Sequence, residues 1–321
     1  MTNRKSRLDV ELFKSTPCLF LENAIKEYVA TSPINCLTAF DNAPIFEEPV
    51  VVFANGDDPI FQDFKTVIGD FHLTPREALE KHVQSKQWNY GLKKHLANVS
   101  VISYVLPEPY ETRFSTRQSP YGGSLRHNHT RWRGEVFQKS IQHHIASLLE
   151  IMGYDAVAPR RAPFFEWTNT PEGVRVNWSE RHVAYASGLG TFGLNGLLIT
   201  PKGCAHYLGS VVCDAALTPT HRPYDHHMAY CLSHRYGMCR KCMERCKGGA
   251  INEMGHSIEK CRHYIRNVQP EKLKELGATE GLIGMAITCG LCWSGVPCED
   301  RIPALKDLEI LRDPLQDVQN P

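Results

Sequence analysis

Short apolar runs closed by turn residues mark the strands that this chain is expected to form. Residues 49–54 read PVVVFA and are followed by NGDDP, and residues 99–106 read VSVISYVL before PEP. Runs rich in valine and isoleucine and bounded by Gly, Pro, Asn or Asp are typical of buried strands. Residues 197–200 and 207–212 fit the same description. We therefore predict four strands before residue 220.

A helical period separates the second and third of these runs. Phe137, Ile141, Ile145, Leu148 and Met152 recur at helical spacing from residue 135 onward, and a glycine follows where the helix would end. A second helix is predicted over residues 179–187. Strands and helices mixed in this way favour a single α/β or α+β domain over residues 1–220.

The composition is that of a globular protein of near-zero net charge. Of 321 residues, 42% are hydrophobic and 22% charged, with 36 Lys and Arg against 35 Asp and Glu. General nucleic-acid binders and polybasic membrane-surface proteins are more basic, so both classes are disfavoured. No apolar run approaches the roughly 18 residues of a membrane span, and the N-terminal residues lack an apolar core. We therefore predict a cytoplasmic protein with no membrane partner.

Cysteine is the residue whose number and position stand out. The chain has 12 cysteines, and eight of them lie between residues 231 and 298. In the reducing cytoplasm, clustered thiols are more often metal ligands or redox groups than disulfides. The other four, Cys18, Cys36, Cys204 and Cys213, are interpreted as small core residues. Residues 221–321 are predicted to form a second domain organised around inorganic centres.

Eight thiols make two sets of four, and four thiolates are what a 4Fe-4S cluster needs. The run CLSHRYGMCRKCMERCKGGAI resembles a bacterial ferredoxin half-motif, although a tyrosine and a lysine replace its usual first cysteine and final proline. In two-cluster ferredoxins the last cysteine of each run ligates the other cluster. The predicted sets are Cys231, Cys239, Cys242 and Cys298 for one cluster, and Cys246, Cys261, Cys289 and Cys292 for the other. Zinc bound by Cys239, Cys242, Cys289 and Cys292, or free and disulfide-bonded thiols, are the alternatives.

The segment GLGTFG has the glycine spacing of the dinucleotide-binding pattern GxGxxG but not its structural context. That pattern must follow a strand and open a helix, whereas here a helix is predicted before the glycines and a strand after them. A nicotinamide site is therefore disfavoured. The glycines either form a plain helix-to-strand loop or let the backbone approach a large planar ligand.

These motifs together resemble a known family. NWSERHVAYASGLGTFGLNGLLIT and the eight-cysteine region resemble the cobalamin-dependent iron–sulfur reductases, which include epoxyqueuosine reductase and the reductive dehalogenases. WSERHVAYASGLGTFG, CLSHRYGMCRKCMERC and TCGLCWSGVPCEDRIP are most similar to the cytoplasmic catabolic reductive-dehalogenase type. The resemblance implies a nitroreductase-like α/β domain that binds base-off cobalamin, followed by a ferredoxin-like domain with two 4Fe-4S clusters. It also implies a loop along the corrinoid, made of Gly188, Leu189, Gly190, Thr191, Phe192, Gly193, Leu194 and Asn195.

The activity implied is reduction of a carbon–heteroatom bond, a carbon–halogen bond among the candidates, in a small organic substrate. Electrons would come from a separate ferredoxin, flavodoxin or flavin reductase. Epoxyqueuosine reductase carries an aspartate where this chain has Val174, and the near-zero net charge offers no polyanion surface, so tRNA is not expected as substrate. The alternatives are an electron-transfer or corrinoid-reactivating protein and an epoxyqueuosine reductase-like RNA-modifying enzyme.

Two residues are candidates for catalysis. Dehalogenases of this type use a tyrosine as proton donor, and Tyr121 in SPYGG is the candidate because its neighbouring glycines could admit a corrin edge. Arg175, before the WSERH helix, could bind a substrate anion or a corrinoid side chain. A loop-packing tyrosine and a solvated arginine are the alternatives. His127 and His129 follow two glycines and are predicted to lie in a loop.

Overall fold

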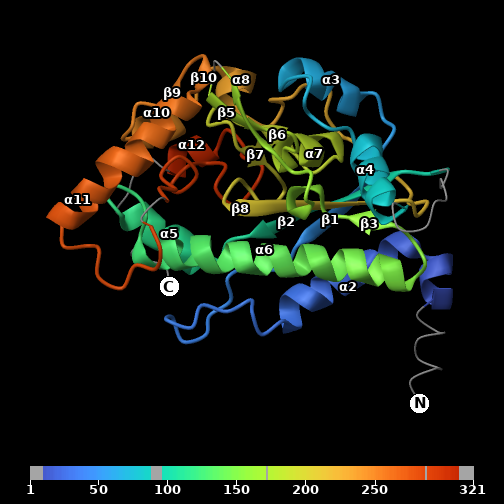
Figure 1. Ribbon diagram of the computed structural model, residues 1–321. Coiled ribbons are helices and arrows are strands. Elements are labelled where there is room, and N and C mark those ends of the chain that lie inside the picture. The colour runs from blue at the N-terminus through green and yellow to red at the C-terminus, as the bar shows by residue number, and fades with distance from the viewer. Residues whose placement is uncertain (1–9, 88–95, 171–172, 286–287, 311–321) are drawn as a thin grey trace.

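A four-stranded antiparallel sheet lies at the centre of the computed structural model, which describes residues 10–87, 96–170, 173–285 and 288–310 (Figure 1). Its strand order is β1-β2-β8-β3. The strands are β1 (Val50–Asn55), β2 (Ser100–Pro107), β8 (His206–Cys213) and β3 (Ala156–Val157). The central strand β2 pairs along its whole length with β8, from Ser100 opposite Cys213 to Pro107 opposite His206.

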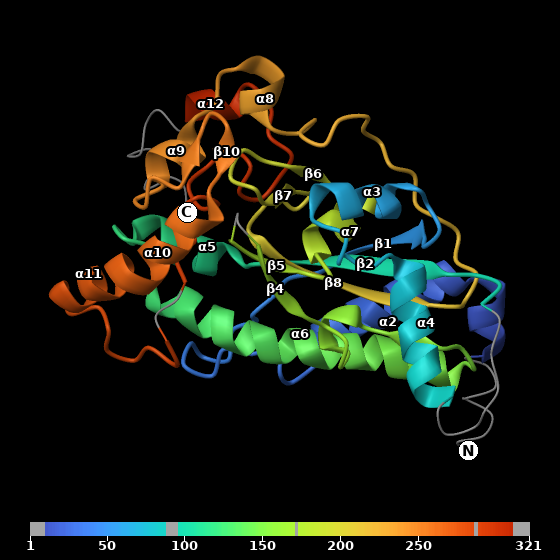
Figure 2. The same ribbon diagram turned by 45° about the horizontal axis from the view of Figure 1, so that its top comes forward.

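Helices cover both faces of this sheet because the apolar side chains of its strands alternate between them. On β2, Ile102, Tyr104 and Leu106 pack with α2 (Pro17–Thr31) and α6 (Leu125–Ile151). Val101 packs on the opposite face with α3 (Ile60–Val67), α4 (Pro75–Gln87) and α7 (Glu180–Ala186). Figures 1 and 2 show α2 and α6 on one side of the sheet and α3, α4 and α7 on the other. These elements thus form the three layers of an α/β fold.

Three small hairpins and the remaining helices stand outside the sheet. The hairpins are β4–β5 (Trp167–Thr170 and Gly173–Val176), β6–β7 (Thr191–Phe192 and Leu198–Ile199) and β9–β10 (Ile251–Asn252 and Gly255–His256). The helices are α5 (Tyr110–Gln118), the short η1 (Pro159–Arg161), α8 (Leu232–Tyr236), α9 (Lys241–Arg245), α10 (Ile258–His263), the π-helical η2 (Tyr264–Val268), α11 (Gln269–Glu275) and α12 (Asp307–Ile310). None of the helices in the described ranges has the length and apolar character that a membrane span requires.

The cysteine-rich segment packs against the α/β layers through short elements and loops. Its apolar centre joins Cys231, Ile251 and Val296 to residues of the β6–β7 hairpin and to Cys204. Backbone bonds cross the predicted domain boundary, with the Cys204 and Ala205 amides donating to the Glu299 carbonyl. The division into residues 1–220 and 221–321 stays a prediction.

The strand predictions are confirmed to within one or two residues, but the strand expected at 197–200 pairs in a separate hairpin. The helix expected from residue 135 begins ten residues earlier, at Leu125, so the loop prediction for His127 and His129 was wrong. The side chain of Ser124 accepts a hydrogen bond from the His127 amide and caps this helix. Both histidines are buried, because Gly281, Ile283 and Thr288 cover the helix start: His129 Nε2 lies 2.9 Å from the Gly281 carbonyl.

Candidate functional site

The eight C-terminal cysteines come together in two groups. In the first, Cys231, Cys239, Cys242 and Cys298 interact electrostatically with one another and line one small cavity. In the second, the same holds for Cys246, Cys261, Cys289 and Cys292, which line a cavity of about 640 Å³. These are the two sets of four named from the sequence, whereas the alternative zinc set takes two thiols from each group. That the groups hold clusters stays a prediction.

Burial favours the neutral form of thiols in both groups, Cys242 in the first and Cys289 and Cys292 in the second. It raises the pKa of Cys289 to about 12 and also raises the pKa values of Cys242 and Cys292. Four such thiols become thiolates only when positive charge lies between them, as in a metal centre that displaces their protons. Within the described ranges, no group of three or more His, Cys, Asp or Glu side chains is arranged to hold a metal ion. What fits an iron–sulfur cluster is the donor set itself, four thiols around one cavity.

A glycine pair holds the loop of Cys289 in place. Gly122 and Gly123 both have positive φ, +77° and +67°, which favours glycine. A Cβ on Gly122 would lie 2.4 Å from the Cys289 carbonyl oxygen and 2.8 Å from its Sγ, and the Gly123 amide donates to that carbonyl. The SPYGG turn therefore fits closely around a cysteine of the second group.

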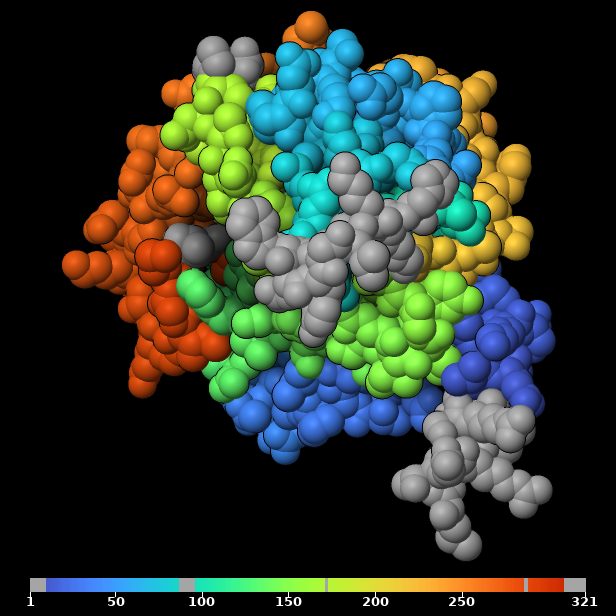
Figure 3. Space-filling model, turned by 45° about the vertical axis from the view of Figure 1, so that its right-hand side comes forward, coloured from blue at the N-terminus to red at the C-terminus, as the bar shows by residue number. Residues whose placement is uncertain are grey.

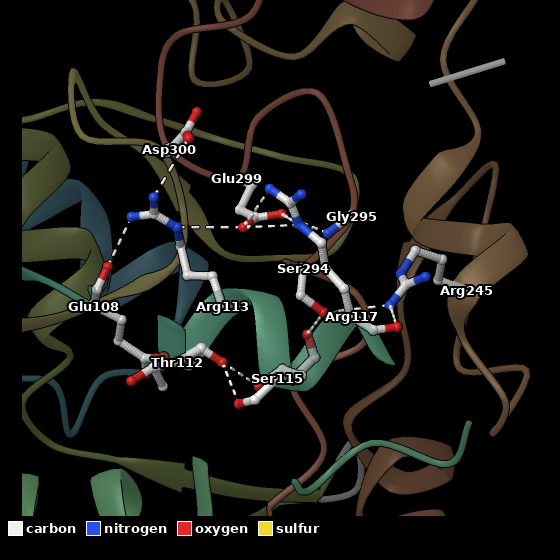
Figure 4. Close-up of polar contacts among 12 residues, drawn as sticks. Glu108, Thr112, Arg113, Ser115, Arg117, Arg245, Ser294, Gly295, Glu299 and Asp300 are labelled. Atoms are coloured by element: carbon white, nitrogen blue, oxygen red, sulfur yellow. Dashed lines mark hydrogen bonds and ion pairs between the residues drawn. The ribbon is translucent and has the colours of Figure 1, made fainter. Parts of the chain in front are cut away.

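Charged residues next to the cysteines fix the same loops to α5 (Figure 4). Glu299, next to Cys298, is buried and accepts from Arg117 Nε at 2.9 Å and from the Gly295 amide at 2.5 Å. Arg113 Nε lies 3.2 Å from the same carboxylate. Arg245, next to Cys246, donates to the Leu291 carbonyl at 3.0 Å. The loop from Leu291 to Glu299 is thus held at both ends.

Polar side chains of the α/β layers face the thiols across the 640 Å³ cavity, which we call the thiol-side cavity. Glu108 is buried after β2, and its Oε2 has no hydrogen-bond partner in the described part of the chain. Burial raises its pKa from 4.5 to about 8. His127 Nε2 lies 3.9 Å from Glu108 Oε1, and burial lowers the pKa of this imidazole to about 3. At neutral pH the cavity therefore holds a protonated carboxyl beside a neutral imidazole.

Two further cavities continue around α7. One, of about 860 Å³, shares Glu180, Arg181, His256 and Cys261 with the thiol-side cavity. The other, of about 550 Å³, shares Arg181 and His256 with both. Because the three cavities share wall residues, we call the region that they line the depression around α7; Cys261 of the second thiol group lines two of them. Such a depression suits a large flat ligand better than a small ion.

The predicted glycine loop lies partly along this depression. Phe192, Gly193 and Leu194 line the 550 Å³ cavity, and Asn195 lines the thiol-side cavity, where its Nδ2 donates to the Cys292 carbonyl at 2.8 Å. The earlier residues make internal contacts instead. A Cβ on Gly190 would lie 2.1 Å from the Ile199 carbonyl oxygen, while Leu189 and Thr191 are buried. A close β6–β7 packing thus explains part of the GLGTFG pattern without a ligand.

The two predicted catalytic residues have different positions. Arg175 lies on β5 and lines the 860 Å³ cavity. Tyr121 is not among the residues that line the three cavities around α7, and its carbonyl accepts hydrogen bonds from Tyr264 Oη and Gln269 Nε2. Their proposed roles stay predictions.

Sequence reasoning missed Glu108 and the pair Arg117–Glu299, since an isolated acid in PEP and an arginine on a polar helix carry no periodic signal. It also took Cys204 as a plain core residue. Cys204 is buried, but its Sγ lies 3.6 Å from that of Cys298 in the first thiol group. The two cysteines lie 94 residues apart in the sequence, so only the tertiary structure shows this contact.

The comparisons with known proteins give structural similarities at low identity. No protein-family model matches the chain, and no curated protein matches it. An epoxyqueuosine reductase from Bacillus subtilis aligns with 81% of this chain at 14% identity and a TM-score of 0.41, covering 63% of that chain. An epoxyqueuosine reductase solved with an epoxyqueuosine-modified tRNA stem loop aligns with 78% at 14% identity and a TM-score of 0.42, covering 61% of that chain.

A catabolic reductive dehalogenase, NpRdhA, aligns with 66% of this chain at 16% identity and a TM-score of 0.43, covering 27% of that protein. The chain therefore spans less than two thirds of the length of each of these proteins.

Proposed function

We propose that this chain is a cobalamin-dependent iron–sulfur reductase that cleaves a carbon–heteroatom bond in a small organic substrate. The observation that carries the proposal is the sorting of eight thiols into two groups of four, with the second group in the wall of the depression around α7. The motifs around Glu180 and the cysteines, which resemble this family, support the same assignment.

In this proposal each thiol group holds one 4Fe-4S cluster, and the corrinoid lies along Phe192, Gly193, Leu194 and Asn195. The groups are close enough for Cys242 to act electrostatically on Cys292, which supports electron passage from the first to the second. When bound, clusters and corrinoid supply low-potential electrons to the substrate. A separate ferredoxin, flavodoxin or flavin reductase would provide a pair of electrons for each bond cleaved.

The chain's own residues would supply the proton and exclude water. Glu108 holds a proton at neutral pH because its pKa is raised to about 8, and its unpartnered Oε2 lines the thiol-side cavity. We propose it as proton donor in place of Tyr121. Leu197, Ile251 and Trp293 line the same cavity and limit its water content. The heteroatom would leave as an anion while carbon gains the proton.

The test is anaerobic purification with iron, sulfide, zinc and cobalt measured on one sample. Two clusters and one corrinoid predict roughly eight irons and about one cobalt per chain. The variant Cys289→Ser should lose about half of the iron, whereas Cys36→Ser, whose thiol contacts Asn42 outside both groups, should keep all of it. Zinc in place of iron would overturn the proposal. Iron without cobalt after reconstitution with cobalamin would favour the alternative function, that of an electron-transfer protein.

A further inference from the structure

The 860 Å³ cavity beside α7 is lined by an unusual number of positive side chains. It lies between the β4–β5 hairpin, the start of α7, and α10 with η2. The space-filling view is hollowed between the yellow-green β4–β5 segment and the orange C-terminal segment (Figure 3). Its lining includes five arginines, Arg160, Arg175, Arg181, Arg262 and Arg266. We call this cavity the arginine cleft.

Negative charge in the arginine cleft is scarce. Glu180 is the carboxylate that lines it, and burial raises the pKa of this group to about 7. Ser210 Oγ donates to Glu180 Oε2 at 2.5 Å and Gln142 Nε2 donates to Oε1 at 3.2 Å, so Glu180 is already occupied. The two histidines of the lining add little charge, because burial lowers the pKa of His182 to about 3 and also lowers that of His256. The cleft therefore carries a net positive charge at neutral pH.

Several of these arginines form no ion pair with a carboxylate of the described residues. Arg262 and Arg266 form no ion pair within the described ranges, and Arg160 lies over the rings of Phe165 and Trp167 at 4.6 and 5.1 Å. Arg181 donates to the Gly196 carbonyl. Some arginines elsewhere are paired with a carboxylate, as in the Arg222–Asp58 pair at 2.8 Å and the Arg117–Glu299 pair. Arg160 is attracted by Glu180 and Glu135, but five positive charges around one cavity still repel one another, and a bound anion would relieve that repulsion.

We propose that the arginine cleft binds an oxyanion, a carboxylate or phosphate group, carried by a small organic substrate of the reductase. The guanidinium fork of arginine fits the two oxygens of such groups and favours them over a simple halide. Trp167, Val174 and Val176 in the same lining provide an apolar surface for the body of the molecule. The assignment of the bound molecule as a substrate rests on the proposed function, but the anion site itself can be tested without turnover.

The position of the site suits that role. Cys261 of the second thiol group and Glu180 line both the arginine cleft and the thiol-side cavity, so an anchored anion would direct the rest of the molecule towards the shared wall. Arg262 follows Cys261 directly in the chain, and Arg266 lies four residues further on the same helical stretch. These two arginines are therefore the ones to change.

The experiment measures binding of benzoate, phenyl phosphate and neutral benzamide to the purified full chain by titration calorimetry. We expect benzoate and phenyl phosphate to bind and benzamide to bind far more weakly. Arg262→Gln and Arg266→Gln should each weaken anion binding by roughly tenfold or more, because each removes a charge-assisted contact. Arg133→Gln, which removes an exposed arginine on α6 that lines none of the cavities described, is the matched control and should bind as the parent does.

A second arm separates the substrate from the cofactor as the source of the anion. Cobalamin carries a phosphodiester in its nucleotide tail and cobinamide does not, so both are titrated into parent and Arg266→Gln protein. Weakened benzoate binding with unchanged cobalamin binding supports the proposal. Weakened binding of cobalamin but not of cobinamide, with benzoate unaffected, would assign the anion to the cofactor and overturn it. Equal binding of benzoate and benzamide would overturn it as well.

Failure of the proposed function has a different signature. A protein that lacks iron and cobalt but still binds benzoate through Arg262 and Arg266 retains the anion site and loses only the reductase. Iron and sulfide are quantified in each variant, because Arg262 adjoins a proposed cluster ligand. Arg266→Gln, which lies further from Cys261, keeps the test decisive if Arg262→Gln loses iron.

Discussion

The buried carboxylate of Glu299 provides the sharpest test of how the cysteine-rich segment is held. Substitution Glu299→Gln keeps the size of the side chain and one acceptor oxygen but removes the charge. The parent carboxylate has 3% of its side chain exposed, and it pairs with Arg117 at 2.9 Å and Arg113 at 3.2 Å. The variant leaves both guanidinium groups without this partner in a largely buried setting.

The expected cost follows from that burial. Removing one partner of a buried ion pair destabilises proteins by roughly 3–5 kcal/mol, since the remaining charge is left uncompensated. Arg113 keeps Asp300 at 3.5 Å and the Glu108 carbonyl at 2.7 Å, which lowers the expected loss to about 3 kcal/mol. Because Glu299 also accepts from the Gly295 amide, the loop that carries Cys292 and Cys298 should loosen.

The assay is urea unfolding of parent and variant at pH 7 under anaerobic conditions, with iron content measured on the same samples. The matched control is Glu253→Gln, which removes an exposed carboxylate that lies 2.6 Å from Arg240. Exposed pairs contribute about 0.2–1 kcal/mol, so this control should change the free energy of unfolding little. A loss below about 1 kcal/mol for Glu299→Gln, equal to the control, would refute the reasoning.

Three further predictions follow from the site. Glu108 takes up a proton on folding because its pKa rises from 4.5 to about 8, so its contribution to the free energy of unfolding is present below pH 4.5 and lost as the pH rises through 8. Unfolding of Glu108→Gln between pH 5 and 8 should therefore show a weaker decline than the parent, and an identical slope would contradict this. Gly122→Ala should displace Cys289 and lower the iron content, whereas Gly153→Ala, where a Cβ meets nothing within 4 Å, should not. If Glu108 is the proton donor, Glu108→Gln should lower turnover of a reducible substrate by roughly a hundredfold or more while Tyr121→Phe leaves it unchanged, and the reverse result would restore Tyr121.

Local pattern was enough to predict three of the four strands of the sheet, all but the two-residue β3, and the second half of α6. A valine-rich run between turn residues is apolar on both faces, so it is expected to form a buried strand. The apolar residues from Phe137 to Met152 lie on one face of a helix, and that face must pack on the core. The start of α6 escaped prediction because His127, Asn128 and His129 are polar. Their burial depends on distant partners, Gly281, Ile283 and Thr288, the last with Oγ1 at 2.9 Å from His127 Nδ1.

The sequence by itself determined that eight cysteines lie at short spacings in one segment, and this pattern predicts metal centres. Only the tertiary structure decided what faces those thiols. Glu108 and His127 line the thiol-side cavity and the five arginines line the arginine cleft, and their spacing in the sequence does not indicate either cavity. The two cysteine sets lie in short loops, so the spacing of the cysteines along the chain limits which of them can come together. The pKa of a carboxyl or the net charge of a cleft depends on desolvation and on neighbours brought together by the fold.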